Sequence, residues 1–281
     1  MNNKVQFLLL AGSIIISTNY VYGSIGQYDT ENIIDFTDRD LVKITILYDN
    51  YVHAAGTRSD WGFSCLIEGI EKTILFDTGT NGDTLLYNID RLKVDLNKVR
   101  LLFLSHIHGD PIGGIRSVVS RNPDISAFVP ISFPDDIGIR TGIKTIFRLD
   151  QPTEICKDVF STGEMGRQIK EQSLLLNTKR GLVIITGCSH PGILEIVKKA
   201  KEIINKDIYL VLGGFHLLQH SDTAMKEIVN EFKRLGVLKC GATHCTGEKQ
   251  IQIFKETYGN NYIEMGTGRI MIITDQEVEL H

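Results

Sequence analysis

Four segments of the chain share one pattern, in which an apolar run passes through small residues into a histidine. The segments are LLFLSHIH (101–108), LVIITGCSH (182–190), IYLVLGGFH (208–216) and VLKCGATH (237–244). The apolar runs are typical of buried strands, and the small residues that follow allow the backbone to turn sharply. If the strands share a direction, their histidines converge on one edge of a β-sheet.

The convergence of several histidines predicts a transition-metal site. One histidine after a strand is usually a buried core residue, but a pattern repeated in four segments is hard to reconcile with that interpretation. Imidazole ligands suit Zn²⁺, which is the expected ion, with Fe or Mn as alternatives at a mixed nitrogen and oxygen site. His106 and His108 can reach one ion from an extended loop, because they are two residues apart. The histidines of the pattern are His106, His108, His190, His216 and His244.

Asp110 adds a carboxylate two residues after His108. Such a carboxylate can bind metal. It can also cap a helix, because aspartate at the N-cap followed by proline at the first helical position is a favourable start. We therefore expect a helix over residues 111–120 that begins at Pro111, with Asp110 as its N-cap. The two roles are compatible, since a carboxylate oxygen can bind metal while the backbone begins a helix.

The rest of the chain predicts an α/β architecture. Residues 41–48 and 62–76 are rich in β-branched and aromatic residues, and the break at Glu68-Gly69 predicts a hairpin. Residues 121–165 contain several glycine and proline breakers and stay unassigned. The second half alternates strand and helix patterns, as in layered α/β proteins. Its predicted helices cover residues 191–205, 222–235 after an N-cap at Ser221, and 247–257, and a strand over 269–274 closes the chain.

The N-terminus has the features of a secretory signal peptide. Lys4 is followed by an apolar run over residues 5–16, shorter than a membrane span, and small residues lie near position 23. We expect residues 1–23 to be removed, with an uncleaved N-terminal anchor as the alternative. Because no linker or low-complexity tract follows, residues 24–281 are expected to form a single domain. The signal peptide predicts that this domain is exported, periplasmic or extracellular, without a stable membrane span.

The net charge bears on the class of partner, and the cysteine content bears on disulfide formation. The formal net charge of −4 argues against a nucleic-acid partner, which normally requires a basic face. The five cysteines are scattered and lack a CxxC pair, so they predict no disulfide framework. Packing is the favoured role for Cys188 and Cys245, although both lie near histidines and could be metal ligands or reactive thiols.

The motifs around these histidines resemble those of a known family. SHIHGDPIGG (105–114) resembles the HxHxDH signature of the metallo-β-lactamase superfamily, and LFDTG (75–79) resembles its preceding aspartate motif. The resemblance covers about residues 41–275. It implies an αββα sandwich with a metal site at one edge of the two sheets. The later motifs resemble those of the branch named after (dihydropterinylmethyl)(ribofuranosyl)aminobenzene-phosphate synthase: GCSH (187–190), GGFH (213–216) and THCTG (243–247).

The resemblance implies a first metal ion held by three histidines, His106, His108 and His190. Asp77 would lie behind these ligands and support their loop by hydrogen bonds. Asp77 in Asp-Thr-Gly is equally compatible with an ordinary turn, which would serve the same supporting role.

The resemblance also implies a second ion, with one ligand missing. Asp110 and His244 would contribute to it, and His216 lies where many relatives place a bridging acid. The signature has a histidine directly after the aspartate, whereas this chain has Pro111, which has no donor atom. We therefore expect either one firmly held ion or an unequal pair with a weak second ion.

A metal-dependent hydrolase is the leading functional interpretation. The ion would activate water for attack on an ester, phosphoester, lactone, thioester or amide of a small-molecule substrate. Asp110 would orient that water or accept its proton. The branch name suggests a pterin-related synthase instead, and Pro111 favours a degenerate, non-catalytic metal-binding protein. A di-iron redox centre is a further alternative. It is less favoured, because the proline at position 111 cannot supply the histidine ligand of the signature.

Overall fold

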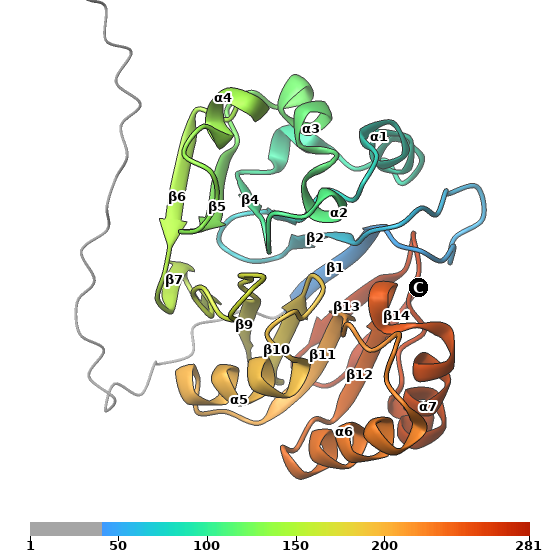
Figure 1. Ribbon diagram of the computed structural model, residues 1–281. Helices are drawn as coiled ribbons and strands as arrows, with labels where there is room; N and C mark the ends of the chain where they lie inside the picture. Colours follow the sequence, from blue (N-terminus) through green and yellow to red (C-terminus); the bar gives the residue numbers. More distant parts are fainter. Residues whose placement is uncertain (1–40) are drawn as a thin grey trace, which may run out of the picture.

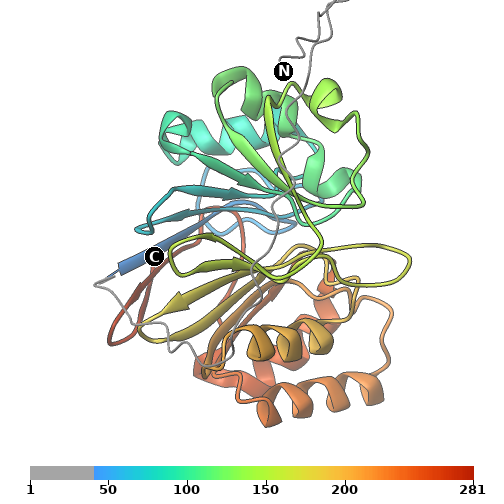
Figure 2. The same ribbon diagram turned by 90° about the vertical axis from the view of Figure 1, so that its left-hand side faces the viewer.

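Two β-sheets pack face to face, and helices cover the outer face of each sheet (Figure 1 and Figure 2). The computed structural model describes residues 41–281. The predicted signal peptide, residues 1–23, therefore lies outside the described part of the chain. No helix within residues 41–281 combines the length and the apolar character that a membrane span requires.

The first sheet has eight strands and is antiparallel in one half and parallel in the other. In spatial order its strands are β14 (Val278–Leu280), β13 (Ile270–Thr274), β1 (Leu41–Tyr48), β2 (Ser64–Glu68), β3 (Ile74–Phe76), β4 (Leu101–Phe103), β5 (Ser126–Pro130) and β6 (Thr145–Leu149). Neighbours are antiparallel from β14 to β3 and parallel from β3 to β6.

The second sheet has six strands, of which three run parallel. In spatial order they are β12 (Lys239–Thr243), β11 (Ile208–Gly214), β10 (Gly181–Thr186), β9 (Leu174–Thr178), β8 (Val159–Ser161) and β7 (Thr153–Cys156). β10, β11 and β12 are parallel neighbours, so their carboxyl ends lie at one edge of the sheet. His190, His216 and His244 follow these three strands and leave the sheet at that edge.

The helices divide between the two outer faces (Figure 1). The eight-stranded sheet is covered by α1 (Gly82–Arg91), α2 (Gly109–Ile112), α3 (Ile115–Arg121) and α4 (Ile137–Thr141), together with the 3₁₀ turn η1 (Leu96–Lys98). The six-stranded sheet is covered by α5 (Ile193–Ile203), α6 (Asp222–Arg234) and α7 (Glu248–Tyr258), with the 3₁₀ turns η2 (His244–Thr246) and η3 (Gly259–Asn261).

Strand β10 shows why the apolar runs of this sequence are continuous. Val183 and Ile185 lie in the core between the two sheets. Leu182 and Ile184 lie in a second core, between the six-stranded sheet and its helices. Successive side chains of a strand point to opposite faces, so a strand covered on both faces carries apolar residues at every position. A third hydrophobic core lies between the eight-stranded sheet and its helices.

Several sequence predictions are confirmed. The break at Glu68-Gly69 separates the paired strands β2 and β3. The Ser221 side chain caps α6 by accepting a hydrogen bond from the Ala224 backbone amide, and Gly236 follows the helix with a left-handed φ of 81°. The final strand prediction was incomplete, because β14 follows β13 and pairs with it.

The predicted helix over residues 111–120 was wrong in two respects. The helix begins earlier, at Gly109, and His108 rather than Asp110 occupies the N-cap position. Asp110 instead lies in the first turn, where its side chain faces His244. The helix is also interrupted between α2 and α3, because this backbone packs tightly on the loop after β3. A side chain at Gly113 would place its Cβ 1.9 Å from the Thr80 carbonyl oxygen.

Candidate metal centre

The histidines at the strand ends lie on loops with an unusual backbone. His106 and His108 follow β4, which belongs to the eight-stranded sheet. Ser189, His216 and His244 take left-handed φ angles of 65°, 54° and 50° in the loops after β10, β11 and β12. Left-handed backbone is uncommon for residues other than glycine, and such strained positions cluster at functional sites. The left-handed backbone therefore sets the direction in which the side chains leave these loops.

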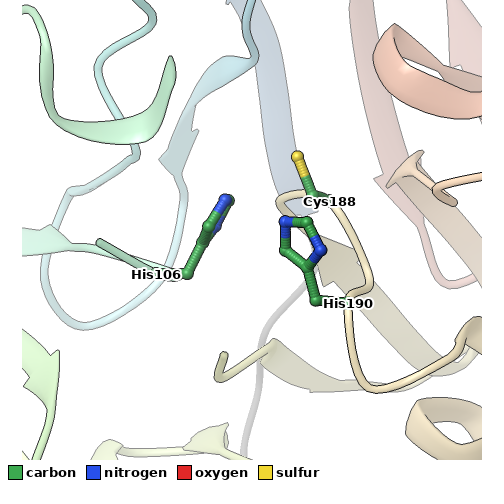
Figure 3. Close-up of side chains that lie close together, drawn as sticks. All are labelled: His106, Cys188 and His190. Carbon is green, nitrogen blue, oxygen red and sulfur yellow. The ribbon is translucent and has the colours of Figure 1, made fainter. Parts of the chain in front are cut away.

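His106, His108 and His190 form a compact group. The centroids of each pair of rings are 4.8 Å apart, and the rings meet edge to face. The buried Nε2 atoms of His106 and His190 have no hydrogen-bond partner among residues 41–281. Buried polar atoms are nearly always paired, so these two nitrogens fit a ligand role. Figure 3 shows the His106 and His190 rings facing a common space, with the Cys188 thiol beside them.

A hydrogen-bonded chain orients His106. The Ser105 hydroxyl donates to Asp77 Oδ2 at 2.6 Å and lies 2.9 Å from His106 Nδ1. Since its hydrogen is directed at Asp77, the hydroxyl oxygen accepts from Nδ1–H, which leaves the lone pair of His106 on Nε2. The Ser105 backbone amide also donates to Asp77. Burial raises the pKa of Asp77, whereas these hydrogen bonds and any cation held at His106 favour its charged form.

Burial keeps two of these imidazoles neutral. Desolvation lowers the pKa of His106 to about 3, with the neighbouring histidines adding to the effect and Asp110 opposing it. Desolvation likewise lowers the pKa of His190 to about 4, with His216 and His108 acting in the same direction. A metal ligand must offer a lone pair, so both rings are in the form that binds metal at neutral pH.

Glu171 holds the loop that carries His190. This residue is fully buried, and its carboxylate accepts hydrogen bonds from three successive backbone amides, those of Cys188, Ser189 and His190. Burial raises the pKa of Glu171 to about 7, and the three amides oppose that rise. Glu171 was not predicted from the sequence, because nothing in the neighbouring residues distinguishes it from a surface glutamate. Only the fold brings the GCSH loop over it.

A second group forms around Asp110 and His244. Asp110 Oδ2 lies 3.0 Å from His244 Nε2 and 3.4 Å from Cys188 Sγ, and Cys188 Sγ lies 3.3 Å from His244 Nε2. Burial alone would raise the pKa of Asp110, but the hydrogen bond and charge of His244 hold it below its ordinary value. Trp61, also missed from sequence, places its ring 5.0 Å from that of His244, centroid to centroid.

His216 lies beside these groups rather than within them. Its ring centroid is 4.3 Å from that of His190, and its side chain is exposed. Within residues 41–281, the groups with metal-ligand spacing combine His106, Cys188 and His190; His106, His108 and Asp110; or Cys188, His244 and Cys245. The predicted ligands other than His216 are therefore brought together. Their assignment as ligands stays a prediction.

A cleft of about 230 Å³ opens next to the histidines. It is lined by Trp61, His216, Leu218, Gln219, His220 and Cys245. His220 thus lines this cleft, whereas His53 and His281 lie elsewhere on the surface. All five cysteines are buried and free.

Comparison with known proteins identifies the family. Residues 62–131 match the sequence model of the metallo-beta-lactamase superfamily. The chain is also 30% identical to the 7,8-dihydropterin-6-methyl-4-(beta-D-ribofuranosyl)-aminobenzene-5'-phosphate synthase of Methanocaldococcus jannaschii, over 83% of this chain and 97% of that protein. This protein belongs to the metallo-β-lactamase superfamily. The predicted family and αββα fold are thereby confirmed.

Two further proteins that resemble this chain are hydrolases by name. The chain superposes on the crystal structure of a metal-dependent hydrolase of the superfamily with a TM-score of 0.71 and 29% identity, covering 83% of this chain and 99% of that one. It is 26% identical to the hydroxyacylglutathione hydrolase of Buchnera aphidicola, over 85% of this chain and 94% of that protein. The similar proteins named here are thus two hydrolases and a synthase.

A substitution at Asp77 tests the predicted first metal site of this metallo-β-lactamase-fold protein. Asp77→Ala removes the group that holds Ser105 and, through it, the Nδ1–H of His106. Loss of such an outer partner typically lowers metal affinity about 10–100-fold, and we expect a loss in that range. Competition with a chromophoric chelator measures it. Asp124→Ala, at an exposed residue paired with Lys144, is the matched control, and equal affinity in both variants would contradict the orienting role.

Proposed function

We propose that this protein is a metal-dependent hydrolase whose first ion, Zn²⁺, is held by His106, His108 and His190. The observation that carries the proposal is the meeting of three imidazoles with 4.8 Å between ring centroids. The buried Nε2 atoms of two of them have no hydrogen-bond partner in the part of the chain that the structure describes. A bound transition-metal ion lowers the pKa of a water molecule and polarises the carbonyl or phosphoryl group under attack. The residues of the chain bind, orient and shield the reactants around it.

Asp110 is the proposed catalytic carboxylate. Its Oδ2 contacts His244 and Cys188. Its Oδ1 faces His106, with 3.8 Å between Oδ1 and His106 Nε2. The two oxygens thus have different surroundings, and Oδ1 is placed to accept a hydrogen bond from a water in front of the first histidine group. Orientation of a nucleophile in this way reduces the entropic cost of attack.

The cleft beside His216 is the proposed substrate site. Trp61 and Leu218 are exposed there, with 48% and 55% of their surface accessible, and the polar side chains of Gln219 and His220 lie next to them. An apolar wall with a few polar groups is typical of small-molecule sites. A small ester, phosphoester, lactone, thioester or amide fits this mixed lining.

Metal removal tests the proposal. We expect protein purified without chelator to contain metal by elemental analysis and to turn over at least one substrate in a panel of phosphodiesters, lactones, thioesters and β-lactams. Chelator treatment should lower that turnover by more than about 100-fold, since even outer-shell changes cost about 10–100-fold. Added Zn²⁺, Mn²⁺ or Fe²⁺ should restore it. Full metal occupancy without metal-dependent turnover on any substrate would favour a non-catalytic metal-binding protein.

A pterin-related synthase is the second candidate, and one observation favours it. The 30% identity to the Methanocaldococcus jannaschii synthase extends over nearly all of that protein. The exposed Trp61 ring beside His244 also offers a flat apolar surface for a planar heterocycle. Assaying condensation of a dihydropterin with a ribosyl aminobenzene phosphate, next to the hydrolysis panel, separates the two candidates by which product forms.

A further inference from the structure

Three side-chain atoms meet next to the position where the superfamily signature has its missing histidine. Asp110 Oδ2, His244 Nε2 and Cys188 Sγ are separated by 3.0, 3.4 and 3.3 Å. Pro111, which replaces the signature histidine, is buried directly after Asp110. The cysteine comes from a different loop, the one that Glu171 holds through its backbone amides. Cys188 is 3% exposed, so its sulfur is surrounded by protein atoms rather than by solvent.

A neutral His244 makes this meeting unfavourable unless a proton or a metal ion binds at its Nε2. Asn50 Oδ1 accepts the Gly62 backbone amide at 3.0 Å and lies 2.9 Å from His244 Nδ1. Because a carbonyl oxygen can only accept, Nδ1 carries a hydrogen and the lone pair of a neutral His244 is on Nε2. That lone pair then faces a carboxylate oxygen at 3.0 Å. A single proton can bridge only two of these three atoms, whereas one metal ion can be coordinated by all three.

The separations also suit a metal ion. In a tetrahedral site, bonds of about 2.0–2.1 Å to nitrogen and oxygen and about 2.3 Å to sulfur place ligand atoms about 3.3–3.6 Å apart. The three observed separations lie at or slightly below this range, so shifts of a few tenths of an ångström would complete the coordination. Cys188 Sγ also belongs to the group with His106 and His190 (Figure 3), so the sulfur is close to that group as well as to Asp110 and His244.

We propose that the Cys188 thiolate is the third protein ligand of a second metal site, with Asp110 and His244, in place of the histidine that the signature has at position 111. The inference rests on the proposed metal-dependent function and specifies its second ion. As the sulfur–metal bond forms, the S–H bond breaks and the proton passes to solvent. A thiolate makes the site selective for Zn²⁺, Co²⁺ or Cd²⁺ over Mn²⁺, which prefers oxygen ligands.

Titration of metal-free protein with Co²⁺ tests the proposal. We expect two equivalents to bind, and a thiolate-to-metal charge-transfer absorption to accompany the second. In Cys188→Ser the first equivalent should bind as before, which also shows that the variant is folded. The charge-transfer absorption should disappear, and the affinity for the second equivalent should fall by at least about 10–100-fold.

Cys240→Ser is the matched control. Cys240 is equally buried, but it lies in the core between the six-stranded sheet and its helices and belongs to none of the metal-ligand groups within residues 41–281. This variant should keep the absorption and both equivalents. Cys245 forms a group with Cys188 and His244, so Cys245→Ser tests the competing thiol. The proposal is overturned if the absorption persists in Cys188→Ser, is lost only in Cys245→Ser, accompanies the first equivalent, or is absent from the unmodified protein.

The ¹¹³Cd NMR shift of the unmodified protein loaded with Cd²⁺ provides a readout that needs no variant. One of two signals should show sulfur coordination, and two signals without sulfur character would contradict the proposal. The outcomes also separate the two proposals. Binding of one equivalent without charge transfer would exclude the Cys188 site and leave the first site standing, whereas binding of no equivalent would remove the basis of the proposed function itself.

Discussion

His190→Ala is expected to abolish tight metal binding at the first site and to lower metal-dependent turnover by more than about 100-fold, beyond the usual effect of an outer-shell change. The ring of His190 stands 4.8 Å, centroid to centroid, from each of the other two histidines, and its buried Nε2 has no hydrogen-bond partner in the described part of the chain. Alanine therefore removes one of the three imidazoles of the proposed first site. Elemental analysis after dialysis and a chelator-competition titration measure the loss.

His281→Ala is the matched control for this prediction. His281 is exposed at the end of the chain and lies near Glu279, so its removal should change neither metal content nor turnover. If His190→Ala retained one tightly bound equivalent and unmodified turnover, the three-histidine site would have to be given up. Circular dichroism of both variants establishes that they are folded before metal is added.

Glu171→Leu is expected to lower the free energy of unfolding of metal-free protein by about 3 kcal/mol or more, because a buried donor left without an acceptor costs about 1–3 kcal/mol. The substitution leaves the backbone amides of Cys188, Ser189 and His190 without their carboxylate. Urea denaturation measures the change. Metal affinity should fall in the same variant, since the loop that carries His190 loses its support.

Two further variants delimit the role of Glu171. Glu171→Gln keeps one acceptor oxygen and should give an intermediate loss. Glu195→Gln, at an exposed residue on α5 paired with Lys198, should stay within about 0.5 kcal/mol of the unmodified protein, as surface substitutions usually do. A Glu171→Leu protein as stable as the Glu195→Gln control would show that the amides find other partners, and that the carboxylate does not hold the loop.

Local patterns were sufficient to predict much of the fold. Strand β10 and helix α6 follow from an apolar run and a capped amphipathic segment, and the structure has both where the sequence predicts them. The hairpin strands β7 (Thr153–Cys156), β8 (Val159–Ser161) and the following β9 (Leu174–Thr178) were not predicted. These strands are only three to five residues long, and strands of this length are stabilised by pairing within the sheet rather than by their own pattern.

The helix start at Gly109 shows a limit of local reasoning. Asp110 and Pro111 match a favourable N-cap pair, yet Asp110 lies inside the first turn of α2. Its hydrogen bonds go to His244 and Cys188, which follow other strands. A tertiary interaction between charged or polar groups thus outweighs a capping preference of about 1 kcal/mol.

The sequence by itself determined which residues could serve a metal site: histidines placed after strands by small residues, an aspartate within the same motif, and a proline where the superfamily signature has a histidine. Only the tertiary structure decided which of them meet, that Glu171 and Asn50 hold the loops of His190 and His244, and that Cys188 lies beside Asp110. The reason is physical. Local pattern reports on the backbone within a few residues, whereas these contacts depend on the order and direction of strands far apart in the chain.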